Sequence, residues 1–106
     1  MRKILFFLLL CMTGISQASI WEGKVESIEV TLTNPVVLFK LSGSLEDTPR
    51  CNVKGMYAID SNLPSGRIAL DLLRSAYETG RAVTAQGLNT CSAHFKAEGL
   101  KLVTFR

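Results

Sequence analysis

The side chains in this sequence that could do chemistry begin with two cysteines and a histidine. Cys91 and His94 stand in a C-x-x-H spacing, and the fold could bring Cys51 beside them. Thiolates and imidazoles are the ligands that zinc prefers in a closed tetrahedral site. A further ligand is not evident, and outside the cytosol the two cysteines form a disulfide instead. We therefore expect no metal site, and we expect His94 to be a polar loop residue.

Candidates for catalysis are sparse. His94 is the single histidine, and no G-x-S-x-G elbow or glycine-rich phosphate loop is present. Glu46, Asp47 and Asp60 could be imagined as paired carboxylates for glycoside hydrolysis. Acidic residues in loops usually serve solvation, however, and a domain this small has little room for a deep cleft. The sequence predicts a protein that is not an enzyme and that carries no cofactor.

Aromatic side chains are better candidates for ligand binding. Trp21 could stack on a sugar ring or pack beneath the fold, and Tyr57 has the same two alternatives. Tyr77 falls on the apolar face of an expected helix, which favours core packing. We take Trp21 and Tyr57 as the candidate ligand-binding residues.

Residues 1–18 have the pattern of a secretory signal peptide. Arg2 and Lys3 precede the apolar run ILFFLLLCM, and Ser16 and Ala18 are the small residues of a cleavage site after Ala18. The apolar run is too short to span a membrane. We expect an exported protein, periplasmic or secreted, without stable membrane insertion after cleavage. Residues 19–106 would then form a single domain.

Removing this leader changes the charge and the cysteine count. The whole chain has a net charge of +3, and loss of Arg2 and Lys3 leaves about +1, with no run of like charges. Nucleic-acid binding needs a concentrated cationic face, so we do not expect it. Cys51 and Cys91 remain as a pair in an oxidising compartment, which predicts a disulfide. Closing a loop of about forty residues stabilises a fold by roughly 4 kcal/mol in the chain-entropy model.

Five strands and one helix are expected to carry these residues. The first strand spans residues 24–33, where Val25 is out of phase with Ile28 and Val30. A β-bulge near Glu26–Ser27 would restore the phase and bend the strand sharply. The other strands are predicted at residues 36–41, 51–59, 81–87 and 100–105.

The helix is expected between the third and fourth strands. Ser65 is the candidate N-cap, and Gly80 suits the left-handed position that ends a helix. The expected buried face consists of Ile68, Leu72, Leu73, Ala76 and Tyr77. This order of elements predicts a mainly β protein, a small five-stranded barrel of the OB-fold type. The disulfide would join the start of the third strand to the end of the fourth.

One segment resembles a known family. LLRSAYETGRAV, residues 72–83, is similar to the helix, helix stop and next strand of the B subunits of bacterial AB5-type toxins, especially the subtilase-cytotoxin and pertussis-like groups. The matching residues are Leu72, Tyr77, Thr79, Gly80 and Val83, together with Trp21 and the cysteine pair. The resemblance implies an exported OB-fold subunit that binds glycans through shallow pockets. It also implies a homo-oligomeric ring, a pentamer, whose helices line a central pore.

Two functions follow from these patterns. The leading hypothesis is a non-catalytic exported domain that binds a carbohydrate or another extracytoplasmic partner, as a toxin-B-subunit-like homo-oligomer. The alternative is a monomeric periplasmic protein-interaction or inhibitor module. The oligomeric state of the mature protein distinguishes them.

Overall fold

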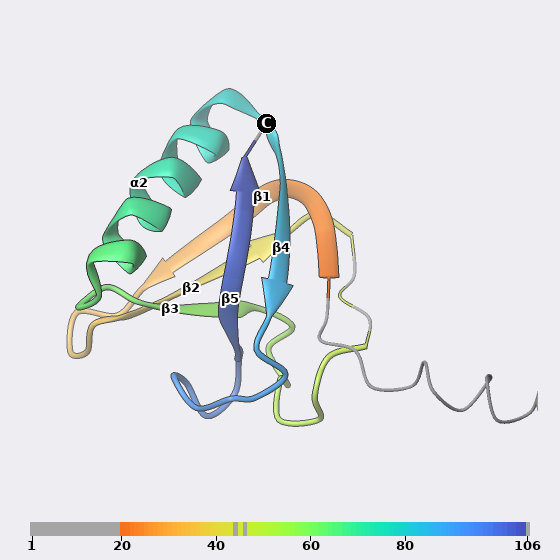
Figure 1. Cartoon of the computed structure of the whole chain (residues 1–106), viewed down its shortest axis with the longest axis vertical. Helices are drawn as coiled ribbons and strands as arrows, with labels where there is room; N and C mark the ends of the chain where they lie inside the picture. The colour runs from red at the N-terminus through yellow and green to blue at the C-terminus, as the bar shows by residue number, and fades with distance from the viewer. Residues whose placement is uncertain (1–19, 44, 46, 106) are drawn as a thin grey trace, which may run out of the picture.

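The structure, a computed structural model, describes residues 20–43, 45 and 47–105. The expected signal peptide, 1–18, and Glu46 lie outside the described residues. Five strands form a closed barrel in the order β1-β2-β3-β5-β4, and the helix α2 lies between β3 and β4 in the chain (Figure 1). This confirms the expected fold. The elements are β1 (Ile20–Val30), β2 (Val36–Leu41), β3 (Tyr57–Asp60), α2 (Pro64–Thr79), β4 (Ala82–Gly87) and β5 (Glu98–Phe105).

The long strand β1 closes the barrel because it bends. Its first half pairs with β4 and its second half pairs with β2, both antiparallel. Val25 lies opposite Leu41 and Ser27 lies opposite Lys40, so Glu26 is an extra residue on β1. The β-bulge expected from the phase of the apolar residues is therefore present. A bulge increases the local twist, and this lets one strand serve two sides of a small barrel.

The barrel interior is filled mainly by large apolar side chains from β2, β3 and α2. Phe39, Leu41, Tyr57 and Leu73 have no exposed surface, and Val83 has almost none. A smaller cluster packs outside this core, beneath the loops, and consists of Leu38, Met56, Ala58 and Ala97. β2 reads as a nearly continuous apolar run because it contributes side chains to both clusters.

The helix begins and packs differently from the sequence prediction. Pro64 occupies its first turn and Leu63 is the N-cap, without a side-chain hydrogen bond, so Ser65 is not the cap. Proline is favoured there because its fixed φ suits a helix. Its missing N–H removes no hydrogen bond, since the first N–H groups of a helix have no acceptor within the helix. At the other end Gly80 has a φ of 70°, and its N–H donates to the carbonyl of Ala76, as expected.

The buried face of α2 is narrower than predicted. Gly66, Leu73 and Ala76 are buried, whereas Ile68 is 62% exposed and Tyr77 is 52% exposed. Helical spacing alone indicated a wider stripe. The helix, however, lies obliquely across one side of the barrel (Figure 1). Besides its buried residues, only Ala69 and Leu70 of the helix are partly buried against the core. The prediction that Ile68, Leu72 and Tyr77 belong to the core was wrong, since Leu72 is 45% exposed as well.

The third strand is shorter than predicted. Residues 51–56 form turns, in which Gly55 has a φ of 64°, and only Tyr57–Asp60 pair as β3. The positive φ at Gly55 interrupts the extended backbone, so the strand-like spacing of Cys51 and Val53 does not continue into β3. The cysteine pair therefore belongs to loops.

Candidate functional site

The two aromatic residues expected to bind a ligand lie inside the barrel. Trp21 is 7% exposed and Tyr57 is fully buried. Their ring centroids are 6.3 Å apart, and the ring of Tyr57 lies 5.5 Å from that of Phe39. A ring surrounded by core side chains has no open face on which a sugar could stack. Both residues are core residues, which corrects their assignment as ligand contacts.

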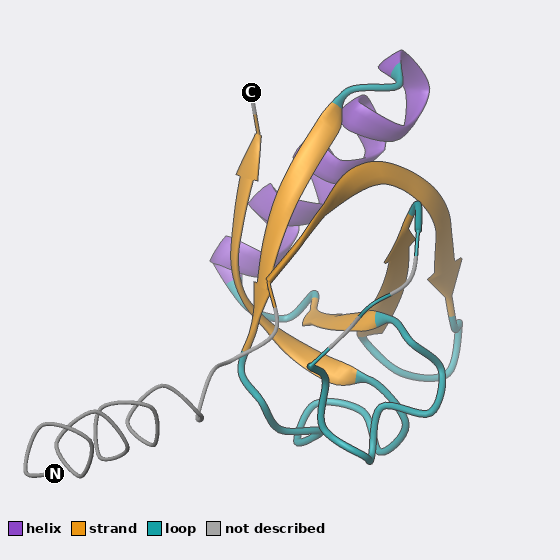
Figure 2. Cartoon of the chain, turned by 90° about the vertical axis from the view of Figure 1, so that its right-hand side faces the viewer, coloured by secondary structure: helices purple, strands orange, loops and turns teal. Residues whose placement is uncertain are grey.

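The predicted disulfide is present and joins two loops. Cys51 and Cys91 are bonded, with an S–S distance of 2.06 Å. Cys51 lies in the loop between β2 and β3, and Cys91 lies in the loop between β4 and β5. Figures 1 and 2 show these loops together at one end of the barrel. The bond therefore fixes the loop end rather than two strands.

A buried carboxylate also holds the loop end. Glu98 has no exposed surface. One carboxylate oxygen accepts a hydrogen bond of 2.9 Å from the Thr48 hydroxyl, and the other accepts one of 2.8 Å from the Asn89 N–H. Asn52 donates to the Thr48 hydroxyl and accepts from the Met56 N–H. Buried polar groups are stable when they are hydrogen-bonded, so Glu98 reads as a structural link between loops.

His94, Phe95 and Lys96 form the tip of the loop after β4, where His94 is half-buried and the other two are exposed. The ring of His94 stacks on that of Phe95 at 5.0 Å, and Lys96 Nζ lies 5.2 Å from the Phe95 centroid. His94 Nδ1 accepts the N–H of Lys96. Phe95 is 73% exposed, and the sequence reading missed it because it stands alone in a polar loop. The described residues contain no group of three potential metal ligands.

One concave surface is a groove between β5 and the first turns of α2, called here the β5–α2 groove. It has a volume of about 290 Å³, and its lining is mostly apolar. Leu63, Leu88 and Leu102 line it and are 54%, 46% and 55% exposed. They come from the loop before α2, the loop after β4, and β5. Apolar side chains that are half exposed around a groove are typical of a binding surface.

The local course of β5 opens this groove. β5 pairs in parallel with β3 only at Glu98 and Gly99, and then continues beside β4 alone. Gly87 lies opposite Leu100 and Gln86 lies opposite Leu102, so Lys101 is an extra residue on β5. A bulge at that point turns β5 away from β3. The end of β3 and the start of α2 form the opposite wall.

Charges are few around the groove. Asp60 and Lys101 line it, and the other lining residues are uncharged. Ion pairs elsewhere on the surface join Lys40 to Glu26 and Lys54 to Glu29, at 3.6 and 3.5 Å. Exposed pairs of this kind contribute little to stability. Recognition in the groove would therefore depend on apolar contact and backbone hydrogen bonds rather than on charge.

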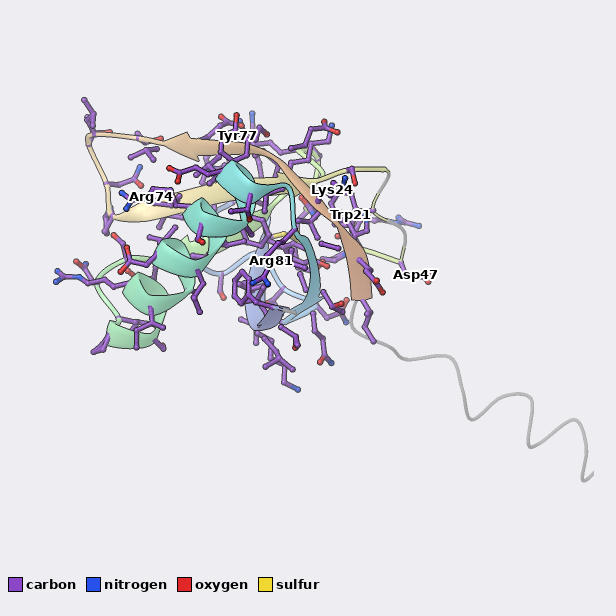
Figure 3. All side chains as sticks on the ribbon, turned by 90° about the horizontal axis from the view of Figure 1, so that it is seen from above. Trp21, Lys24, Asp47, Arg74, Tyr77 and Arg81 are labelled. Carbon is purple, nitrogen blue, oxygen red and sulfur yellow. A yellow bond between two sulfur atoms is a disulfide. The ribbon has the colours of Figure 1, made fainter. Side chains whose placement is uncertain are left out.

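A second groove, with two charged residues in its lining, lies on the other side of α2. Its volume is about 310 Å³, and Ile28, Val30 and Leu70 line it with Asp71 and Arg74. Figure 3 shows Arg74 and Tyr77 along α2 and Trp21 at the distant end of β1. This groove has fewer lining residues than the β5–α2 groove, and we do not assign it a ligand.

Comparison of the chain with known protein families, characterised proteins and solved structures finds no match. The functional argument therefore depends on the surfaces described above. In the part of the chain that the structure describes, no helix has the length and apolar character needed to cross a bilayer.

Proposed function

We propose that this protein is an exported, non-catalytic binding domain that recognises a polypeptide partner through the β5–α2 groove. The observation that carries the proposal is the convergence of Leu63, Leu88 and Leu102 on one apolar groove, each about half exposed. Export is supported by the leader pattern and by the disulfide, because disulfides persist outside reducing compartments. The proposal favours the protein-interaction alternative over sugar binding.

The available surface energy agrees with a binding role of modest strength. Burying a leucine fully contributes about 1.5–3 kcal/mol, so covering the exposed halves of these three adds about 2–4 kcal/mol. Association also costs translational and side-chain entropy. The leucines alone would support weak binding, and a partner must add other contacts, such as backbone hydrogen bonds.

Glycan binding by a ring of identical subunits is the second candidate. Besides the toxin resemblance, it is favoured by the exposed ring of Phe95, because loops at one end of an OB barrel commonly bind oligosaccharides. The exposed Ile68, Leu72 and Tyr77 on α2 offer an apolar surface for association between copies. Sedimentation velocity of the oxidised mature protein tests this candidate, which requires a pentamer-sized species.

Parallel screening of a random-peptide display library and a glycan array tests the proposed function. The proteins are the oxidised wild type and three variants: Leu102→Lys in the groove, Phe95→Ala at the loop tip, and Leu32→Ser as a matched surface control. Leu32 is 96% exposed and does not line the groove. Circular dichroism confirms that each variant is folded.

We expect the wild type and the Leu32→Ser variant to enrich the same peptides, and the Leu102→Lys variant to lose them. A lysine in the groove would have to bury its charge against apolar side chains. A glycan bound by the wild type and lost only in Phe95→Ala would contradict the proposal and favour the second candidate. Peptides that bind Leu102→Lys as well as the wild type would also contradict it.

A further inference from the structure

β5 is a strand with one open side. From Leu100 to Phe105 it pairs with β4, and its pairing with β3 is confined to Glu98 and Gly99. Within residues 20–43, 45 and 47–105, no other strand pairs with the remaining side of β5. A strand edge presents a row of backbone N–H and C=O groups that another extended chain can pair with. Beyond Gly99, that row lies on the side of β5 where its pairing with β3 has ended.

The open side of β5 and the apolar groove overlap along residues 100–103. Leu100, Lys101, Leu102 and Val103 of β5 line the β5–α2 groove, opposite Leu63 at the start of α2. Figure 1 shows β5 beside β4 at the front of the barrel, with α2 on the side of β5 away from β4. An occupant of the groove would therefore meet backbone hydrogen-bonding groups and apolar side chains together. A free strand edge supplies affinity, and adjoining pockets for alternate side chains supply specificity.

We propose that the partner presents an extended segment that adds to β5 as a further strand, with every second side chain directed into the β5–α2 groove. The inference rests on the proposed function and specifies the conformation of the bound segment. The pairing involves Leu102–Phe105, beyond the bulge at Lys101, so the added strand is about four residues long, or roughly 13 Å. The apolar lining requires apolar residues at alternate positions of the segment.

A partner segment fits this edge better than a second copy of the chain does. The edge is recessed, because the end of β3 and the first turns of α2 flank it. A second copy using the same edge would also bring its own α2, which flanks its β5, into the limited width beside the first copy's β5. One extended segment needs only the width of a strand, about 4.8 Å between neighbouring backbones. The bulge at Lys101 also limits the length of straight edge, which disfavours open-ended sheet growth.

N-methyl scanning of a peptide selected on the wild-type protein tests the conformation. Replacing one backbone N–H at a time by N–CH₃ removes a donor and leaves the side chain unchanged. In an added strand, alternate residues direct their N–H toward the neighbouring strand. We expect roughly tenfold or greater loss of affinity at every second position and little change between them.

Amide hydrogen exchange of the protein supplies the matching observation. Between Leu102 and Phe105, alternate amides pair with β4 and the others point to the open side of β5, which borders the groove at Leu102 and Val103. We expect the amides on the open side to exchange rapidly in the free protein and to slow by roughly tenfold or more with the peptide bound. Amides of the loop tip at residues 94–96 serve as the control and should not change.

The outcomes separate the inference from the function on which it depends. Binding that requires Leu102 but shows flat N-methyl sensitivity, or a helical period of three to four, would overturn strand addition and leave the groove as the binding site. Failure to enrich any peptide that depends on Leu102 would overturn both. A free protein that self-associates, and becomes monomeric as Leu102→Lys, would assign the edge to a second copy and overturn the inference.

Discussion

Gly66→Ala is expected to destabilise the protein, against the usual direction for a helix glycine. Alanine in place of glycine within a helix normally contributes about 1 kcal/mol of stability. Here a Cβ on Gly66 would overlap the carbonyl oxygen of Asp60 and lie 3.3 Å from Ile59 Cγ2. The Asp60 carbonyl cannot move freely, because it belongs to β3 and accepts the N–H of Leu63 at 3.2 Å. The helix must shift instead.

The expected magnitude follows from these opposing effects. Overpacking a well-filled site costs about 1–3 kcal/mol, and overlap with backbone falls at the upper end. After the gain in helix propensity, the net loss in the free energy of unfolding is about 1–2 kcal/mol. For a domain of this size that lowers the midpoint temperature by roughly 5–15 °C. Shifting α2 also loosens the packing of its own Leu73 and Ala76, which are buried against the barrel.

Thermal and urea unfolding of the oxidised protein measure this loss. Trp21 is the single tryptophan and is buried, so its fluorescence reports on the core while far-ultraviolet circular dichroism reports on α2. Gly80→Ala is the matched control, because its φ is 70° and a Cβ there meets no atom within 4 Å. That variant should lose about 1 kcal/mol through backbone strain alone. A higher midpoint temperature for Gly66→Ala would refute the close packing of α2 on β3.

Other expected outcomes concern the loop end and the core. Replacing Cys51 and Cys91 by serine should cost about 4 kcal/mol, because the cysteines are 40 residues apart and the unfolded chain gains loop entropy; urea unfolding measures it. Equal stability of the reduced and oxidised proteins would contradict this. Glu98→Gln should cost about 1–3 kcal/mol, because the amide has one acceptor oxygen for the two hydrogen bonds that the carboxylate oxygens receive; unchanged stability would count against the link between loops. Leu73→Ala should cost about 2–5 kcal/mol in the same assay because Leu73 is fully buried, whereas the exposed Leu72→Ala should cost far less.

Local patterns predicted the elements whose signals depend on neighbours in the sequence. Apolar continuity placed β2 at residues 36–41, and the phase change after Val25 located the bulge in β1. Gly80 was placed correctly because the left-handed position that ends a helix strongly favours glycine. The cysteine pair followed from the expected oxidising compartment. These features together were sufficient for the order of elements and the barrel.

The sequence could not predict which apolar side chains the barrel leaves uncovered. Trp21 and Tyr57 are buried because their strands, β1 and β3, direct these side chains into the barrel. The positions of both strands depend on pairing between segments that are far apart in the sequence. The helix face was overestimated because helical spacing identifies a stripe but not the width of the surface that covers it. Val53 had strand-like spacing, yet the turns before β3 leave it 70% exposed.

The groove was missed for the same reason. Leu63 lies in a polar loop, Leu88 follows the end of β4, and Leu102 lies on the last strand, so no local window contains them together. No local signal marks them, because Leu102 has an ordinary strand partner in Leu100 and the other two stand in loops. Their convergence depends on β5 leaving β3 at the bulge of Lys101, which becomes visible only in the register of β4 and β5.

The most direct test of the central claim is to map amide chemical shifts of the ¹⁵N-labelled oxidised protein during titration with a display-selected peptide. The claim predicts that the largest changes fall on Leu63, Gly66, Leu88 and residues 100–105, with little change at residues 94–96. Changes concentrated at the Phe95 tip, or on Ile68 and Leu72 of α2, would place the binding surface elsewhere and contradict the account.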